Sequence, residues 1–531
     1  MIKNSHDFVP TSDPRRIRIP GTDRVYDRNK ILVVLLVTLM MSLLQVSSVN
    51  TALSVMQTSL HASDTALQWV LSGYTLAIGI TLVPAGRLGD IFGRSLIFTI
   101  GLIVFTLSSF ALGFANSTTT LNVLRLIQGF GSGVFSPQIT GLIMQYFNGR
   151  ARAKAFAYFG LVVSMSVAAG PVLSGLFISV LGDNLGWRLA FAVNAPIGLI
   201  GVLLAIFWLP FGKERRHFAN QNKAIEGMVE PRVRKESSEK IDLDPFGMLL
   251  LGSAVVAIML PFMLHVTAWK WFIMLAGFIL LALWILWEHS YQKHGHFPMV
   301  DLSLFKIKTF SYSMGIASLQ FLGGPSMFVI LAIFLQEGLG VSALESGLVT
   351  LPNALVSAYA AMWAGKRAYD HGRGIQAIAL SLTLLGALSM IIVSIAVHAG
   401  FSYWLFSLPL ILSGFGGGAM GSANQTQAML DVPTEHGGTA GGVIQTGQRM
   451  ATAIGTALVT AVFFATRGTP TDATWYLGIA TAYSVIAIIF VIGLIVALVF
   501  WRDGYHSRHR NTRTARVNYL KDRKSTRRRK N

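Results

Sequence analysis

The chain has 531 residues, of which 53% are hydrophobic and only 13% are charged. This composition excludes a soluble domain of this length and indicates an integral membrane protein. There is no cysteine, which excludes disulfides, thiol nucleophiles and thiolate metal sites. The net charge of +19 is typical of nucleic-acid-binding proteins, but the bases gather in the tails and polar connections, so we expect no nucleic-acid partner.

The apolar segments predict fourteen membrane-spanning helices, because each is close to the roughly 20 residues that cross a bilayer. In chain order they are expected at 31–53, 67–86, 95–115, 119–145, 153–180, 188–210, 246–266, 270–289, 310–336, 344–364, 375–398, 402–424, 439–465 and 476–501. The expected fold class is therefore an all-α integral membrane protein.

The positions of the 43 Lys and Arg residues predict the orientation in the membrane. Arg188, Lys270 and Arg467 lie on one side, and Arg125 and Arg449 lie inside expected spans. All the others lie on the side that both termini share. We therefore expect a multi-pass protein of the cytoplasmic membrane with both termini in the cytoplasm.

Charged connections divide the chain into bundles. The expected parts are a disordered cytoplasmic tail (1–30), a six-helix bundle (31–210), a cytoplasmic linker (211–245), an extra helix pair (246–289), a cytoplasmic connection (290–309), a second six-helix bundle (310–501) and a basic cytoplasmic tail (502–531). The basic tail either fixes topology and solubility or holds anionic lipid headgroups, at roughly 1 kcal/mol per base. Paired bundles around a site near the membrane midplane are typical of secondary transporters.

The connection from Gly86 to Arg94 is a charged turn between two apolar segments. Gly86 and Gly93 allow a tight turn and close approach of helix ends. Asp90 can accept hydrogen bonds from helix-end amides, and Arg94 can reach helix C-termini or lipid phosphates. We expect the turn to latch one pair of helices to another; the alternative is a loop whose charge only fixes topology. A weaker copy of it occurs at 365–373.

The expected span 119–145 carries a polar face. Arg125, Gln128 and Gly129, with Ser132, follow the spacing i, i+3, i+4 and i+7, so they share one side of the helix. A charge inside a span is costly and by default marks a functional site facing the bundle interior. The alternative is an arginine whose side chain extends to the outer membrane surface.

Gly170, Pro171 and Gly175 lie in the expected span 153–180. Proline removes a backbone hydrogen bond, and the small residues permit a bend and close helix packing. The segment is either a functional bend or a packing kink.

These motifs resemble those of the major facilitator superfamily. The turn 86–94 is similar to that family's loop between helices 2 and 3, although Ile91 and Ser95 stand where it usually has bases. The Arg125 motif resembles one implicated there in proton coupling, and the segment at Gly170 resembles its antiporter motif. Residues 187–198 and 301–305 resemble the fourteen-helix drug/proton antiporter branch. The resemblance implies a major facilitator fold, two six-helix bundles plus two extra central helices, and multidrug efflux.

One departure concerns proton coupling. Gln45 occupies the place of the acid that this branch carries in its first helix, and glutamine cannot exchange a proton near neutral pH. No acidic residue lies in the middle of any expected span, so Arg125 and Arg449 lack a buried counter-charge. Coupling by a peripheral acid such as Asp64 or Glu337, an uncoupled protein, and an anionic substrate or lipid that pairs with the arginines all remain open.

Polar residues within the expected spans are candidates to line a substrate cavity, although each can instead bond a neighbouring helix. They are Gln45, Ser48, Tyr74, Gln138, Gln320, Asn353, Asn424 and Arg449. We expect no cofactor and no metal. Gly416–Gly421 matches a dinucleotide-binding pattern but lies inside a span with no preceding strand.

We therefore expect a secondary active transporter, not an enzyme. It would export amphiphilic or drug-like small molecules by alternating access, with proton antiport in question because of Gln45. The alternatives are a carrier or flippase for an anionic lipid or metabolite that is not coupled to protons, and a transporter-like sensor or scaffold.

Overall fold

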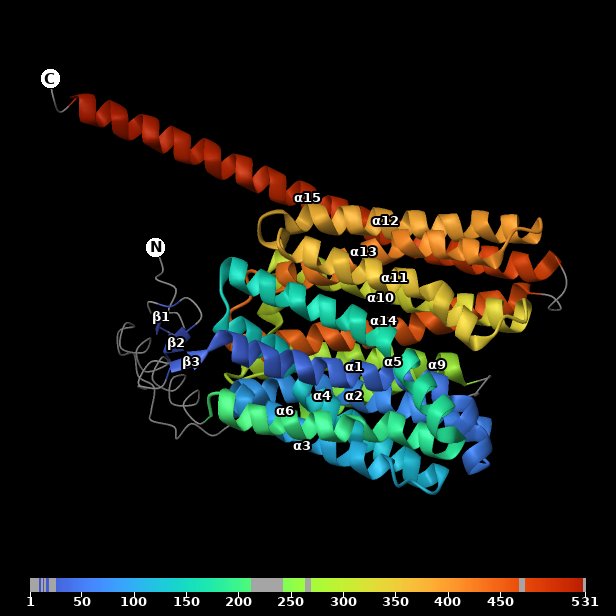
Figure 1. Cartoon of the computed structure of the whole chain (residues 1–531). Coiled ribbons are helices and arrows are strands. Elements are labelled where there is room, and N and C mark those ends of the chain that lie inside the picture. Colours follow the sequence, from blue (N-terminus) through green and yellow to red (C-terminus); the bar gives the residue numbers. More distant parts are fainter. Residues whose placement is uncertain are drawn as a thin grey trace.

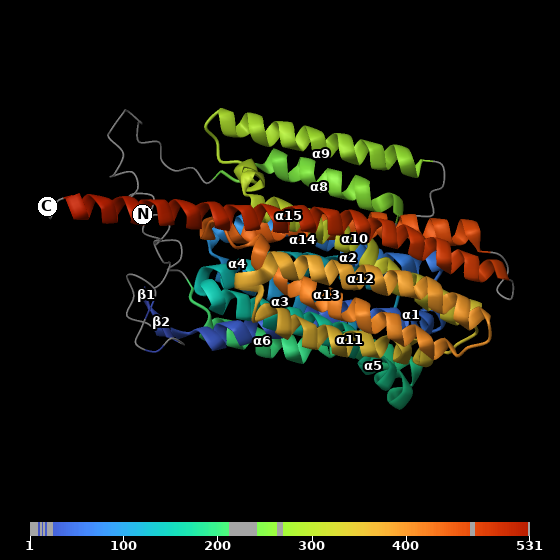
Figure 2. The same cartoon turned by 90° about the horizontal axis from the view of Figure 1, so that it is seen from above.

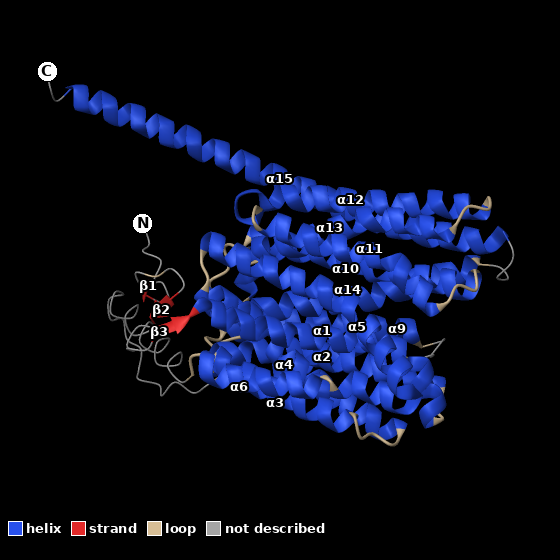
Figure 3. Ribbon diagram, in the orientation of Figure 1, coloured by secondary structure: helices blue, strands red, loops and turns tan. Residues whose placement is uncertain are grey.

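The computed structural model describes residues 9–10, 13, 16–18, 25–211, 242–262, 269–467 and 473–528. Almost all of them are helical, and the long helices run side by side along one direction (Figure 1, Figure 3). Both chain termini lie at the same end of the molecule (Figure 1). We call this end the terminal end.

The first bundle contains six helices. They are α1 (Arg28–Leu60), α2 (Asp64–Phe92), α3 (Arg94–Leu112), α4 (Thr118–Tyr146), α5 (Gly149–Ala192) and α6 (Asn194–Trp208). Gly182 interrupts α5 with φ +76° and ψ 169°, so the residues after it turn back along the bundle. The span expected at 188–210 is therefore shared between the end of α5 and α6.

The second bundle contains six more helices. They are α10 (Lys308–Ile333), α11 (Ala343–Gly365), α12 (Ala368–His398), α13 (Ser407–Ala428), α14 (Gly437–Thr466) and α15 (Ala473–Arg528). A π-helical turn, Phe334–Gly338, follows α10, and short 3-10 turns at Leu302–Lys306, Tyr403–Phe406 and Thr434–His436 precede α10, α13 and α14. The second bundle lies above the first in Figure 1.

The extra helix pair lies on the flank of this body, not in its middle. Helix α8 (Pro245–Met259) continues into a 3-10 turn, Leu260–Phe262, and pairs with α9 (Lys270–Lys293). Gly79 of α2 leaves room for Val255 and Met259 of α8. Helix α9 lies outermost (Figure 2) and exposes large apolar side chains such as Phe272 and Leu286. The pair is thus central in the sequence but peripheral in space.

The described residues contain fourteen α-helices, and ten segments among them are long and apolar enough to cross a membrane, with α5 and α6 counted as one. Helix α8 is apolar but shorter. Helices α4 and α11 are not among the ten; α4 carries Arg125, Gln128 and Gln138. The expected number of fourteen spans therefore exceeds what length and hydropathy alone support.

Within the tail expected at residues 1–30, the structure describes three short strands. Strands β1 (Val9–Pro10), β2 (Arg16–Arg18) and β3 (Val25–Asp27) form an antiparallel sheet. The Arg-Ile-Arg alternation of β2 turns Ile17 to one face, where it is fully buried. Helix α15 continues through the basic tail to Arg528, whereas residues 212–241 of the expected linker lie outside the described part.

Gly93 separates α2 from α3. Its φ of +105° is a backbone conformation that residues with a Cβ rarely adopt. We expect Gly93→Ala to destabilise the fold by roughly 1–3 kcal/mol, because the backbone would have to hold this strained conformation. Thermal unfolding in detergent measures the change. Gly315→Ala is the matched control, since Gly315 has no positive φ and a Cβ there would meet no atom within 4 Å; equal unfolding temperatures for the two variants would contradict the expectation.

Candidate functional site: a latch between the bundles and a buried arginine

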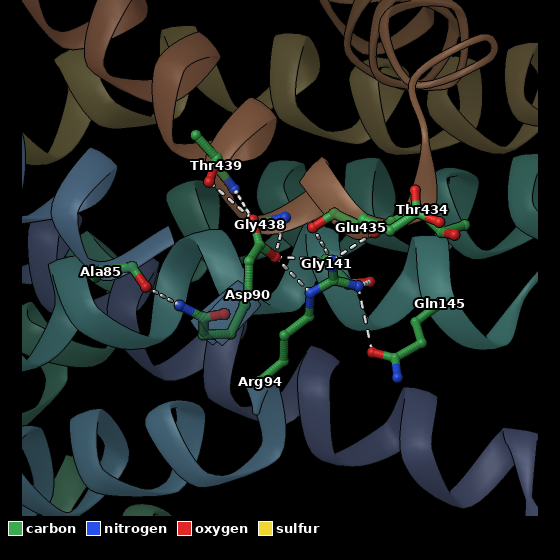
Figure 4. A network of polar contacts seen from close by, with 10 residues as sticks. Ala85, Asp90, Arg94, Gly141, Gln145, Thr434, Glu435, Gly438 and Thr439 are labelled. Atoms are coloured by element: carbon green, nitrogen blue, oxygen red, sulfur yellow. Dashed lines mark hydrogen bonds and ion pairs between the residues drawn. The ribbon is translucent and has the colours of Figure 1, made fainter. Parts of the chain in front are cut away.

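Asp90 joins the first bundle to the start of α14. Its carboxylate accepts hydrogen bonds from the backbone amides of Gly438 (3.1 Å) and Thr439 (2.9 Å) and from the Thr439 hydroxyl (2.8 Å), as Figure 4 shows. The first amides of a helix have no partner within the helix and form its positive end. The carboxylate therefore binds α14 as an anion binds a helix N-terminus.

Arg94 completes this contact from the first turn of α3. Its guanidinium forms an ion pair with Asp90 at 2.7 Å, and both side chains are almost fully buried. It also donates to the carbonyl oxygens of Thr434 and Glu435, just before α14, and to Gly141 on α4 (Figure 4). We call Asp90, Arg94 and residues 434–439 the latch.

Glycines bring the backbones of α2 and α14 into contact beside the latch. A Cβ on Gly86 would lie 2.5 Å from the carbonyl oxygen of Gly438, and one on Gly442 would lie 2.5 Å from that of Leu82. Atoms this close leave no room for any side chain. Residues 86–92, expected as a turn, are the helical end of α2, and only Gly93 separates them from α3. This end of α2 therefore packs across the bundles as well as bonding across them.

A second junction joins α5 to the other bundle at the terminal end. Arg152 donates to the carbonyl oxygen of Met429 (3.2 Å), and Arg150 pairs with Asp370 (3.1 Å). The latter side chains are 79% and 40% exposed, so water screens this pair far more than the buried pair of the latch. Asp370 belongs to the weaker copy of the 86–94 motif at 365–373, where the acid stands one position later than in the motif. Its exposed pair with Arg150 is weaker than the buried pair of Asp90 and Arg94.

The two bundles are packed differently toward the opposite end. Ser164 of α5 and Ser357 of α11 share a hydrogen bond of 2.8 Å. Further from the terminal end, a Cβ added to Gly175 of α5 or Gly347 of α11 would meet nothing within 4 Å. This conformation is therefore closed at the terminal end, whereas α5 and α11 leave open space beside Gly175 and Gly347.

Arg125 lies inside the first bundle and is only 1% exposed. Its Nε donates to the carbonyl oxygen of Val70 (2.9 Å) and its Nη1 to Oε1 of Gln128 (2.7 Å), while its guanidinium covers the Tyr74 ring at 4.0 Å. Gln128 in turn donates to Ser109 of α3 (2.8 Å). Arg125 thus faces the bundle interior, and neutral groups rather than a carboxylate surround it.

Gly129 lies in the same contact, because a Cβ there would lie 2.6 Å from the carbonyl oxygen of Tyr74. The Tyr74 hydroxyl shares a hydrogen bond of 3.3 Å with Ser42 of α1. It also lies near the guanidinium of Arg449 of α14, which is half-buried. Among the described residues no carboxylate forms an ion pair with Arg125 or Arg449.

Several predicted cavity residues bond a neighbouring helix of their own bundle. Gln45 accepts from Asn194, Ser48 donates to the carbonyl oxygen of Gly170 (3.1 Å), and Gln138 donates to that of Ala85 (2.6 Å). In the second bundle, Asn353 donates to the carbonyl oxygen of Leu410 (2.9 Å) and Asn424 accepts from Gln376 (2.9 Å).

These side chains also lie at different depths. Asn424 is four residues from the end of α13, which places it about 6 Å from the terminal end. Gln138 contacts the end of α2 at Gly89. Arg449 lies twelve residues into α14, about 18 Å along the helix from its start. Gln320 of α10 is half-buried, and its Oε1 has no hydrogen-bond partner in the protein. Arg449, with Tyr74 near it, and Gln320 therefore remain the candidates for the space between the bundles.

The segment at Pro171 packs against α1 at one of its two glycines. A Cβ on Gly170 would overlap Ser47, whereas Gly175 faces open space. The peripheral acid Glu337 forms an exposed ion pair with Arg467 at 3.0 Å. The side chain of Asp64 lies outside the described part.

Two features of the junctions between the bundles had no signature in the sequence. The partners of Asp90 and Arg94 are mostly backbone groups more than 300 residues away, and any residue can supply these. Arg152 was one base among many near the tails. Only its position at the start of α5 shows that it spans the junction.

The sequence comparisons agree with this architecture. The family model described as Major Facilitator Superfamily matches residues 35–241 and 246–456. The chain is 29% identical over 438 residues to a probable actinorhodin transporter of Streptomyces coelicolor, covering 82% of this chain and 72% of that protein. It is 26% identical over 436 residues to the tetracenomycin C resistance and export protein of Streptomyces glaucescens, covering 81% and 74%.

Among solved structures, the human organic anion transporter MFSD10 is similar in fold, with a TM-score of 0.61 and 15% identity over 88% of this chain and 99% of that one. The chain therefore belongs to the major facilitator superfamily, and its relatives indicate the multidrug-type branch. Proteins of this family are multi-pass transporters of the cell membrane and not enzymes.

We expect Asp90→Asn to weaken the closed state by about 1.5–3 kcal/mol, the usual value of hydrogen bonds to a charged group. Because the chain has no cysteine, spin labels can be placed at Leu176→Cys on α5 and Leu348→Cys on α11, both exposed. Pulsed electron resonance should show the distance between them shortening as the terminal end opens and the opposite end closes.

Asp370→Asn is the matched control, since it removes the exposed pair with Arg150, which is worth at most about 1 kcal/mol. A larger change of the distance distribution in Asp370→Asn than in Asp90→Asn would contradict the assignment of the latch.

Proposed function

We propose that the chain is a secondary active exporter of amphiphilic, drug-like small molecules across the cytoplasmic membrane. The observation that carries the proposal is the contact of Asp90 and Arg94 with α14, which joins two separately packed bundles at one end. Its partners across the bundles are backbone groups and one hydroxyl, which water can replace when the bundles separate. Such a contact suits a transporter that alternates between two conformations.

The direction of export is supported by the relatives. One is named as a resistance and export protein, and another as a probable transporter of actinorhodin. The orientation follows from charge: we propose fourteen spans with both termini in the cytoplasm, because all but five of the 43 bases lie on the side of the termini. The latch then closes the cytoplasmic side.

The proposed gating and coupling groups are Gly86, Asp90, Gly93, Arg94, Arg125, Gln128, Gly129, Gly170, Pro171 and Gly175. Within this set the latch holds the closed state, and Arg125 fixes the packing of α2, α3 and α4 through Val70 and Gln128. Tyr74 lies beside both Arg125 and Arg449, so we propose that substrate binds near it.

A substrate with an acidic group is favoured by Arg449. An intramembrane arginine normally pairs with an acid, and none is in reach among the described residues. A dansyl-labelled fatty acid and its methyl ester test this preference, because they differ only in the charge. We expect Arg449→Gln to reduce export of the acid to the level of the ester, and Arg449→Lys to retain most of the difference. Equal export of both probes by the native protein would refute an acidic substrate.

The proposed function itself is tested in sealed proteoliposomes with an imposed pH gradient. Actinorhodin, tetracenomycin C and ethidium are added in turn, and their uptake or release and the luminal pH are followed for the native protein and Gln45→Asp. Gradient-dependent movement of at least one compound is expected, and none for any compound would refute the proposal. Substrate-dependent proton movement by the native protein would show that coupling uses an acid outside α1.

A further inference from the structure

A group of acidic residues lies where the α8–α9 pair meets α2, at the terminal end. Asp244 precedes α8 and is 1% exposed, and Glu288 lies five residues before the end of α9 and is fully buried. Helix α8 packs against both α2 and α14, the two helices that the latch joins. We call Asp244 and Glu288 the acid pair.

The polar atoms of the acid pair are incompletely satisfied. Both carboxyl oxygens of Glu288 and Oδ2 of Asp244 are buried without a hydrogen-bond partner in the protein. The amides of Met299 and Val300 and the indole of Trp284 face Glu288 but do not reach hydrogen-bond geometry. A buried carboxylate whose nearby donors are not aligned with its oxygens is costly, and the negative charge of Asp244 adds to the cost of ionising Glu288.

The backbone holds Asp244 in this position. Its φ of +44° is uncommon for a residue other than glycine. Its Oδ1 accepts from the amide of Gly247 (2.9 Å) and from the indole of Trp287 (3.0 Å), so α8 and α9 both fix the carboxyl group. The position of the Asp244 carboxyl group is therefore built into the hairpin.

The charged and titratable groups around the pair are few. Arg87 of α2 interacts electrostatically with Asp244, Glu288 and Asp242, and also with Asp90 of the latch. Its Nε is buried without a hydrogen-bond partner. Tyr291 and His296 approach from α9 and the loop after it. Because Arg94 already pairs with Asp90, Arg87 is left facing the carboxyl groups of Asp242, Asp244 and Glu288.

Asp242 differs from the acid pair because both of its carboxyl oxygens accept hydrogen bonds. Burial raises its pKa, but hydrogen bonds from the Tyr291 hydroxyl (2.6 Å) and from the amides of Asp244 and Phe297 outweigh this effect, so the pKa lies below its usual range. Asp242 therefore stays ionised at neutral pH, and the excess negative charge falls on the acid pair.

We infer that the carboxyl group of Glu288, with Asp244 near it, forms a proton-binding site that ties the closing of the latch to pH. A metal cation is a poorer occupant, because the described residues contain no group of three His, Asp or Glu arranged as metal ligands. Opening the terminal end separates α2 from α14, moves Arg87 relative to the pair and admits water. The O–H bond then breaks and the proton passes to water.

This role of the proton-binding site rests on the proposed function in one respect, namely that transport proceeds through the open and closed conformations. It gives the chain a proton-binding acid on the extra helix pair, where Gln45 supplies none in α1. The sign follows from linkage: the closed state binds the proton, so low pH favours it, and raising the pH favours opening.

The proton itself is observed by infrared difference spectroscopy of the purified full-length protein as the pH is raised. We expect the carbonyl band of a buried carboxylic acid to disappear in the native protein and to be absent from the start in Glu288→Gln. Asp503→Asn is the matched control, because Asp503 is an exposed acid at the same end, paired with Lys308. A native protein without this band, or an unchanged band in Glu288→Gln, overturns the proposal.

Two further variants test the site if Glu288→Gln does not fold. Asp244→Asn, which retains a side chain suited to begin a helix, should move the midpoint of the carboxyl titration to lower pH, because it removes the neighbouring negative charge. Arg87→Gln should move the midpoint to higher pH, because it removes the positive charge. Midpoints unchanged in both variants overturn the proposal.

The link to the latch is read from the Leu176→Cys and Leu348→Cys labels. Raising the pH should shorten their distance in the native background and leave it unchanged with Glu288→Gln. A pH response that survives Glu288→Gln overturns the link.

The exporter proposal and the proton site can fail separately. If the native protein moves no compound while the carboxyl band behaves as expected, the exporter proposal fails and the proton site stands. If compounds are moved and the band is absent, the proton site fails and the exporter proposal stands.

Discussion

The carboxylate of Asp90 on the first amides of α14 is the interaction on which the arrangement of the two bundles depends. A helix N-terminus offers unpaired amides and a partial positive charge, and a buried anion satisfies both. Arg94 neutralises the carboxylate and bonds the turn before α14, so no charge is left unpaired when the latch closes. All the partners on α14 can be hydrated, and the contact can therefore open without leaving buried polar groups unsatisfied.

The two junctions at the terminal end differ in strength for a physical reason. The latch is buried and reinforced by glycine contacts such as Gly86 with Gly438, whereas the Arg150–Asp370 pair is exposed and screened by water. Closure therefore depends mainly on one junction. The α8–α9 pair contacts α2 and α14, the helices of that junction, which gives a peripheral hairpin a route to influence it.

The buried arginines show how a charge can be held inside a membrane protein without a carboxylate. Arg125 bonds a carbonyl oxygen and an amide and lies over an aromatic ring, so its hydrogen-bonding groups are used although its charge is not neutralised. Arg449 has Tyr74 as its electrostatic neighbour. This difference is why we propose Arg449, and not Arg125, as the arginine that meets a ligand.

The sequence by itself determined the class of protein, the positions of the helices and the motif residues of the turn, because hydropathy and glycine spacing act locally along the chain. It also predicted that Arg125 faces inward with Gln128, since both follow from helical periodicity. It left open whether Gln138 and Asn424 line a cavity or bond neighbouring helices. It did not predict that the extra pair lies on the flank or that residues 9–27 contain a small sheet. The partners of Asp90, the unpaired oxygens of Glu288 and the position of Arg87 beside it were decided only by the tertiary structure. Backbone amides have no sequence signature, and burial depends on helices that are distant in the chain.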